Sequence, residues 1–131
     1  MAIHINTLNG GDITITTGGS APTGHTETRF TLEGGTVETY NITGTLDRQW
    51  MIDNGYYDED NWEWIKTITQ VDIGNTVTSI GTDAFTLCSG LTSVTIPDTV
   101  TEIGMDAFGE CSGLTSVTIS NDVTNIWSNA F

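Results

Sequence analysis

Two groups of residues in this sequence carry side chains suited to chemistry, the first being a pair of cysteines. Cys88 and Cys111 are 23 residues apart. A thiolate is a nucleophile and a metal ligand, but both roles need partners such as histidine nearby. The only histidines, His4 and His25, lie far earlier in the chain and share no ligand spacing. We therefore expect two buried free thiols, with a disulfide between them as the alternative.

The second group is a set of carboxylates between residues 53 and 63. Calcium prefers such oxygen ligands, but their order does not match the calcium loop of an EF-hand, so we expect a solvated surface and leave calcium binding open. No serine, histidine and aspartate can be grouped as a triad. The sequence predicts no catalytic, metal-binding or cofactor-binding residue, and hence a protein that is not an enzyme. The acidic group comprises Asp53, Asp58, Glu59, Asp60 and Glu63.

The charge of the chain restricts its partners. Among 131 residues, 17 are acidic and three are basic, which gives a net charge of −14. This balance argues against nucleic acid and anionic membrane surfaces, which attract clustered lysine and arginine. No apolar run reaches the roughly 20 residues that span a bilayer, and the first residues do not resemble a signal peptide. The 25 threonines favour β structure.

A 23-residue repeat must position the cysteines. The segment Cys-Ser-Gly-Leu-Thr-Ser-Val-Thr-Ile at 88–96 recurs unchanged at 111–119, and aligned apolar positions extend the pattern over 68–131, or about 2.8 units. Leu91, Val94 and Ile96 have the spacing of the short strand of a leucine-rich repeat. A short helix or 3₁₀ turn is predicted over 83–87 and 106–111, with the first aspartate as its N-cap or as an acid of its first turn.

Residues 91–111, Leu-Thr-Ser-Val-Thr-Ile-Pro-Asp-Thr-Val-Thr-Glu-Ile-Gly-Met-Asp-Ala-Phe-Gly-Glu-Cys, resemble the BspA-like (Treponema-type) leucine-rich repeat. The resemblance covers about half of the chain. It implies a curved solenoid with a strand-lined concave face. It also implies adhesion or protein binding on bacterial or protist surfaces, in gut microbes or in their phages. The third copy departs from the pattern, because Ser120 replaces the proline and Trp127 replaces the turn glycine.

Residues 1–67 do not repeat, and we expect a β-rich region that caps the repeats. The pattern predicts a strand over 12–16, loops at 10–11 and 18–24, and a β-hairpin over 29–42 that turns at Gly34-Gly35. Thr45 is expected to cap a short helix over 46–52. Trp62 aligns with Phe85 one repeat later. The predicted fold is therefore β-rich with short helical turns, with a boundary between 1–67 and a leucine-rich solenoid at 68–131.

Outward-facing positions of the repeat strands form the candidate binding surface. They make two polar columns that suit a peptide edge or the hydroxyls of a glycan. Tyr56 and Tyr57, beside Trp62 and Trp64, form a more anchor-like patch, with the alternative that these rings are the core of the cap. The two columns are Gln70, Ser93 and Ser116, and Asp72, Thr95 and Thr118.

The last repeat predicts an interface. The chain stops part-way through its third unit, so we expect an apolar end and an unpaired strand edge that pack against another copy or another protein, most simply about a two-fold axis. The candidate interface residues are Ile119, Val123, Ile126, Trp127 and Phe131.

The expected function is a non-catalytic, extracellular or cell-surface adhesion module that recognises a protein or glycan. The alternative is a virion-exposed structural or host-recognition component of a phage particle, with residues 1–67 as the docking part.

Overall fold

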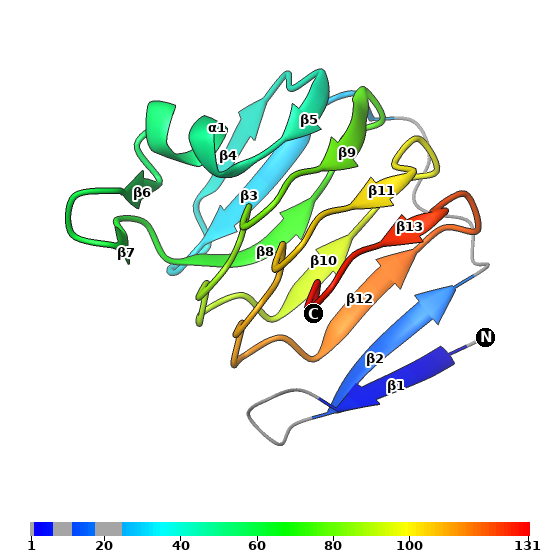
Figure 1. Cartoon of the computed structure of the whole chain (residues 1–131). Helices are drawn as coiled ribbons and strands as arrows, with labels where there is room; N and C mark the ends of the chain where they lie inside the picture. Colours follow the sequence, from blue (N-terminus) through cyan, green and yellow to red (C-terminus); the bar gives the residue numbers. More distant parts are fainter. Residues whose placement is uncertain (1, 7–11, 18–24) are drawn as a thin grey trace.

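The computed structural model describes residues 2–6, 12–17 and 25–131, which form two main sheets (Figure 1). The first sheet, here sheet A, has the strand order β1-β2-β12-β10-β8-β3-β4, and the second, sheet B, has the order β13-β11-β9-β5. Sheet A contains β1 (Ala2–Asn6), β2 (Asp12–Thr17), β3 (Thr28–Leu32), β4 (Val37–Tyr40), β8 (Ile68–Asp72), β10 (Ser93–Thr95) and β12 (Ser116–Ile119). Sheet B contains β5 (Gly44–Leu46), β9 (Val77–Ile80), β11 (Glu102–Ile103) and β13 (Asn125–Ile126).

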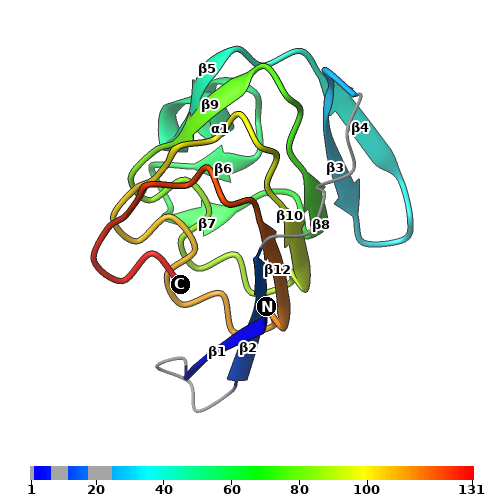
Figure 2. The ribbon, with the colours of Figure 1, turned by 90° about the vertical axis from the view of Figure 1, so that its right-hand side faces the viewer.

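The sequence repeat becomes strand pairing. In sheet A, Val94 pairs in parallel with Val71 on one side and Val117 on the other, each 23 residues away. In sheet B, Ile103 pairs with Ile80 and Ile126 in the same way. Each repeat therefore gives one strand to each sheet, and Figures 1 and 2 show the coils lying one above the next. The predicted repeat strands are confirmed.

A ladder of aromatic rings runs between the coils. Phe108 stacks between Phe85 and Phe131, with ring centroids 5.2 and 5.3 Å apart and planes within 6° of parallel, as the repeat predicts. At the N-terminal end the next ring is Trp64, 6.3 Å from Phe85. The expected alignment of Trp62 with Phe85 is wrong, because the connection before β8 is two residues shorter than a repeat, and Trp62 is 77% exposed.

Threonine hydroxyls join successive coils. Thr92 donates to the carbonyl of Thr69 at 2.9 Å, and Thr115 donates to that of Thr92 at 3.3 Å. Beside sheet B, the hydroxyl of Thr124 donates to the carbonyl of Thr101 at 3.1 Å. In the described part of the chain the structure records a single salt bridge, between Lys66 and Glu38. Hydroxyl–carbonyl bonds thus supply polar cross-links between successive coils.

The turns of the repeats are not helical. Residues 83–87 and 106–110 form hydrogen-bonded turns, so of the two expectations, a short helix or a 3₁₀ turn, the helix is wrong. Asp83, Asp106 and Asn129 occupy the same repeat position with φ of 58°, 54° and 55°. A helix N-cap is extended, whereas these residues are left-handed, a conformation that aspartate and asparagine tolerate better than most. The left-handed backbone of the turn therefore explains why aspartate or asparagine occupies this repeat position.

The described helix α1 (Arg48–Asp53) lies where a helix was predicted, but its cap differs. Asp47 is the N-cap, and its side chain accepts a hydrogen bond from the amide of Trp50 at 2.9 Å. Thr45 cannot be the cap because it belongs to strand β5, whose pairing with β9 extends through Leu46. After the helix, β6 (Tyr57–Asp58) and β7 (Glu63–Trp64) form a small antiparallel pair.

The N-terminal region shares the sheets and the core of the repeats. The predicted hairpin is confirmed as β3 and β4, with φ of 91° and 93° at Gly34 and Gly35. Strand β3 pairs antiparallel with β8, and β5 pairs parallel with β9. The strand predicted at 12–16 is β2, which pairs with β12. The glycine loops at 10–11 and 18–24 lie outside the described residues.

The β-rich class with short turns is therefore confirmed, while the two-sheet arrangement is more mixed than the resemblance implied. Sheet A combines a parallel centre, made by β2, β12, β10 and β8, with antiparallel strands at both ends. A uniform solenoid would have parallel strands throughout. The non-repeating strands β3 and β4 instead continue the sheet beyond the first repeat.

Candidate functional site

The two polar columns predicted on the repeats are assembled on sheet A. Ser93 pairs with Gln70 and Ser116, and Thr95 pairs with Asp72 and Thr118. Gln70 and Ser116 are exposed, and the other four are half-buried. The columns continue onto β3, where Thr31 is the partner of Gln70 and Arg29 that of Asp72. The sheet thus presents hydroxyl, amide and carboxyl groups in rows.

The tyrosines proposed as a surface anchor are buried instead. Tyr56 and Tyr57 are 0% and 4% exposed, so the expected exposed patch is wrong for them and the alternative, a core position, holds. Tyr56 packs against Phe30, with ring centroids 5.1 Å apart. Its hydroxyl donates to Glu38 Oε1 at 2.6 Å, a contact that a sequence pattern does not reveal because the two residues are 18 apart.

Around Tyr56 lies a charged cluster, which we call the Glu38–Lys66 cluster, made of Glu38, Tyr40, Tyr56 and Lys66. Lys66 Nζ donates to Glu38 Oε1 at 2.9 Å and lies 4.7 Å from the centre of the Tyr56 ring. The hydrogen bonds from Tyr56 and Lys66 hold the pKa of Glu38 below its usual value. Burial, reinforced by the bond to Glu38, raises the pKa of Tyr56, so its hydroxyl stays protonated. The groups of this cluster satisfy one another.

The two cysteines are free and buried, as predicted. Cys111 Sγ donates to the carbonyl oxygen of Phe85 at 3.1 Å. Burial raises the pKa of Cys111 to about 12, and burial together with the neighbouring Cys111 raises that of Cys88. A thiol that stays protonated at neutral pH is a poor nucleophile and metal ligand. The cysteines therefore contribute to the packing of the hydrophobic core.

One member of the acidic group at 53–63, Asp58, stabilises a turn. The carboxylate of Asp58 accepts hydrogen bonds from the amide of Asp60 at 2.9 Å and the side chain of Asn61 at 2.8 Å. The bond from Asn61, with the backbone bond from Asp60, lowers the pKa of Asp58. Across the described residues no group of three or more potential metal ligands occurs. His25 hydrogen-bonds the carbonyl of Glu27 at 2.7 Å, and the side chain of His4 lies outside the description.

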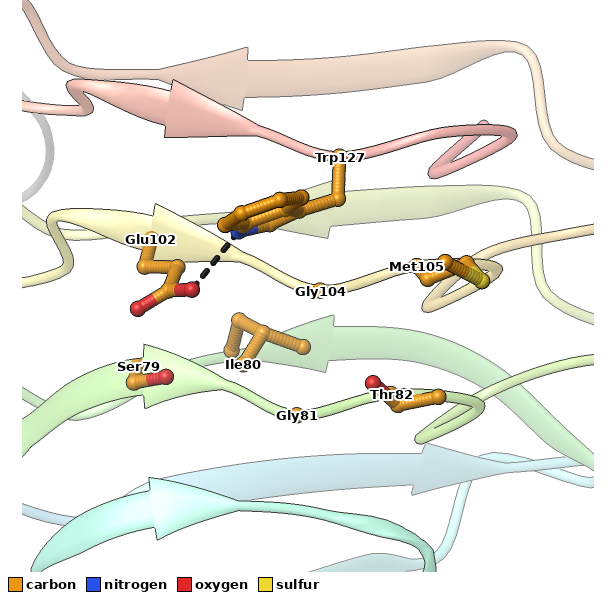
Figure 3. Close-up of a pocket in the computed structure, with 8 residues that line it drawn as sticks. All are labelled: Ser79, Ile80, Gly81, Thr82, Glu102, Gly104, Met105 and Trp127. Atoms are coloured by element: carbon orange, nitrogen blue, oxygen red, sulfur yellow. Dashed lines mark hydrogen bonds between the residues drawn. The ribbon is translucent and has the colours of Figure 1, made fainter.

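Sequence reasoning missed a groove on sheet B, which we call the Trp127 groove (Figure 3). It has a volume of about 240 Å³, opens to solvent and is lined by residues of the first and second coils, with Trp127 from the third. Trp127 Nε1 donates to Glu102 Oε1 at 2.6 Å across its upper wall. The residues that line it are Ser79, Ile80, Gly81, Thr82, Glu102, Gly104, Met105 and Trp127.

Glycines make room for this groove. Gly81, Gly104 and Trp127 occupy the same position in successive repeats. A Cβ on Gly104 would lie 2.6 Å from the backbone nitrogen of Thr82, so the close approach of the coils requires glycine there. Trp127 replaces this glycine in the third coil, and its indole lies over the second coil with about half of its surface exposed. The departure of residue 127 from the repeat was the signal for this site.

The candidate interface in the last coil is partly covered. Ile119 is buried, Val123 and Phe131 are half-buried, and Ile126 and Trp127 are exposed. The expectation of an unpaired edge on the last strand of sheet A is wrong, because β2 pairs with β12 from Ser116 to Ile119. The exposed apolar surface is thereby reduced to the sheet B side of the coil.

Comparison with known proteins identifies the repeat. A family model described as "BspA type Leucine rich repeat region (6 copies)" matches residues 58–131, more than half of the sequence. The chain belongs to the BspA-type leucine-rich repeat family. No curated protein and no solved structure matched it.

The limits of the BspA-type match agree with the structure. The match begins at residue 58, ten residues before the predicted start of the repeats, and so includes Trp64, the first ring of the aromatic ladder. The family generally comprises non-enzymatic modules for protein interaction and is typical of surface proteins. No helix in the described ranges has the length and apolar character needed to cross a bilayer.

Proposed function

We propose that this BspA-type repeat protein is a non-catalytic adhesion module that acts outside the cell and recognises a protein or glycan through its repeats. The observation that carries the proposal is the family match over residues 58–131. The two polar columns on sheet A support it, because they present hydrogen-bonding groups in rows on a rigid sheet. The protonated, buried thiols and the self-satisfied Glu38–Lys66 cluster support a role without catalysis.

A binding screen with matched variants tests this proposal. The immobilised chain is presented to arrays of extracellular proteins and of glycans. Replacing Ser93 with arginine places a bulky side chain in the middle of the polar columns, and Ser112→Arg makes the same change at an exposed turn position. We expect one class of ligand to bind saturably, with loss of binding for Ser93→Arg only. No saturable binding on either array, or equal loss in both variants, contradicts the proposal.

The alternative, a phage structural component that docks through residues 1–67, has weaker support. Strands β3 and β5 pair with repeat strands, and Phe30 packs against Phe85 at 6.3 Å. Residues 25–67 are thus committed to the same core as the repeats. The adhesion proposal needs no separate docking part and is preferred.

Self-association through the last coil remains part of the proposal. Ile126 and Trp127 are the exposed apolar residues of that coil. Burying Ile126 against a second copy would remove apolar surface from water in both partners. Sedimentation velocity at tens of micromolar is expected to show a dimer or larger species that Ile126→Ser dissociates. A monomer at that concentration rules out self-association and leaves the adhesion proposal intact.

A further inference from the structure

The Glu38–Lys66 cluster shows how this protein combines an aromatic ring, a carboxylate and a cation. Lys66 Nζ lies 2.9 Å from Glu38 Oε1 and 4.7 Å from the centre of the Tyr56 ring. Nearby, the guanidinium of Arg48 lies 4.0 Å from the centre of the Tyr57 ring. A cation over a ring is attracted by the electron-rich face, and a carboxylate beside it adds to the attraction.

The Trp127 groove repeats the first two components without the third. Trp127 offers a half-exposed indole, and Glu102 lies beside it, joined by the 2.6 Å hydrogen bond from Nε1. In Figure 3 the second carboxylate oxygen of Glu102 points away from the indole. None of the groove residues is basic, and residues 68–131 contain seven acidic residues and no lysine or arginine.

The rest of the groove suits a long side chain with a charged end. Met105, which is 45% exposed, provides an apolar contact, while Ser79 and Thr82 provide hydroxyl groups along the lower wall. Lysine and arginine both carry an aliphatic stem that packs on apolar surface while the head stays near polar groups. A groove of about 240 Å³ that opens to solvent admits such a side chain from outside.

We propose that the Trp127 groove binds a lysine or arginine side chain from a basic segment of a partner protein, with the cation over the indole of Trp127 and beside the carboxylate of Glu102. The proposal rests on the proposed function and specifies the partner chemistry. The net charge of −14 favours such a partner, since it attracts basic segments over a distance. A neutral glycan would gain no electrostatic attraction from this negative charge.

Titration with short peptides tests this proposal. The probes are tetra-arginine and tetra-lysine amides, with a tetra-glutamine amide and an N-acetylglucosamine oligomer as neutral controls. The readout is the NMR signal of the Trp127 indole N–H, assigned by its loss in Trp127→Phe. We expect a saturable shift with a basic peptide only, weakening as salt is added. A shift with the neutral sugar and none with either basic peptide overturns the proposal.

Matched charge variants separate the groove from general attraction. Glu102→Gln should weaken peptide binding about tenfold, as loss of a carboxylate beside a cation–ring contact implies. Glu110→Gln removes the same charge at an exposed position outside the groove and should change affinity less than about twofold, since exposed charges are screened. Equal weakening in both variants contradicts the proposal.

The outcomes also distinguish this site from the proposed function. Trp127→Gly restores the glycine of the other repeats and should abolish the peptide response. If it leaves peptide binding unchanged, the groove is not the site. If the chain still binds an array ligand in a manner sensitive to Ser93→Arg while no basic peptide binds, the groove proposal fails and the adhesion proposal stands.

Discussion

The two halves of this protein are held together by different means. Residues 25–67 use individual contacts, such as the Glu38–Lys66 cluster and the four-ring packing of Phe30, Tyr40, Trp50 and Tyr56. Residues 68–131 use the same contact again in each coil: a ring on a ring, a hydroxyl on a carbonyl, a strand on a strand. The repeats need no charge pairs, because every coil supplies the partner that the previous coil requires.

The largest effect is expected from breaking the aromatic ladder. Phe108 is fully buried and stacks on both sides, so Phe108→Ala removes two ring contacts and leaves a cavity. We expect a loss of about 3–5 kcal/mol in the free energy of unfolding. Urea denaturation followed by circular dichroism measures it. A mutant that melts like the wild type shows that the ladder does not hold the coils together.

The close approach of the coils gives the next effect. A methyl group on Gly104 would meet backbone atoms of the preceding coil at 2.6–2.7 Å, and backbone cannot move aside easily. Gly104→Ala should therefore cost about 1–3 kcal/mol. Gly109→Ala is the control, because its nearest contact would be 3.3 Å. Equal stability of the two variants in urea would mean that the coils are further apart than described.

High pH should destabilise the repeats through their thiols. The buried Cys88 and Cys111 have raised pKa values in the folded state, so folding favours the protonated thiols. Their contribution is fully present below the ordinary thiol pKa near 9 and is lost as pH rises toward the folded values. Each thiol should cost about 1.4 kcal/mol per pH unit above 9.

Urea melts between pH 8 and 10.5 measure this slope, which the double variant Cys88→Ala, Cys111→Ala should reduce. Tyr56 has the same sign, since its raised pKa adds a loss of stability above its ordinary value near 10. The double variant therefore keeps part of the slope at the upper end of the range. An unchanged slope in the double variant would show that ionisation of the two thiols does not contribute to the loss of stability at high pH.

The smallest effect concerns a single hydroxyl of the threonine ladder. Thr92→Val keeps the shape of the side chain and removes the hydrogen bond to the Thr69 carbonyl, for a loss of about 1 kcal/mol. Thr78→Val is the control, at an exposed strand position for which the described structure records no side-chain hydrogen bond. If Thr92→Val is as stable as the control in a urea melt, the hydroxyl contributes nothing.

The same difference explains what the sequence could predict. A repeated contact leaves a repeated spacing, so the strands at 93–95 and 116–119 and the stacking of Phe108 could be predicted from the spacing of 23 residues. A contact that occurs once leaves no pattern. The burial of Tyr56 depends on Glu38 and Phe30, and the pairing of β2 with β12 joins residues about 100 apart.

The turns and the groove fall between these cases. Asp83, Asp106 and Asn129 were visible as a repeating acidic or amide position, but the residue types suit both a helix N-cap and a left-handed turn, and only the backbone decides between them. Trp127 was visible as a departure from glycine. Its pairing with Glu102 required the lateral position of neighbouring coils, which spacing along the chain does not give.

Native-state hydrogen exchange tests the central claim, that these two differently built regions form one folded unit. The amide of Tyr56 donates to Met51 at 2.9 Å in the N-terminal region, and the amide of Phe85 donates to Ala107 at 2.7 Å in the repeats. If the core is shared, both amides should exchange with the same free energy of opening, equal to that of global unfolding. A much lower free energy for Tyr56 than for Phe85 would show that residues 25–67 open separately, and would contradict a shared core.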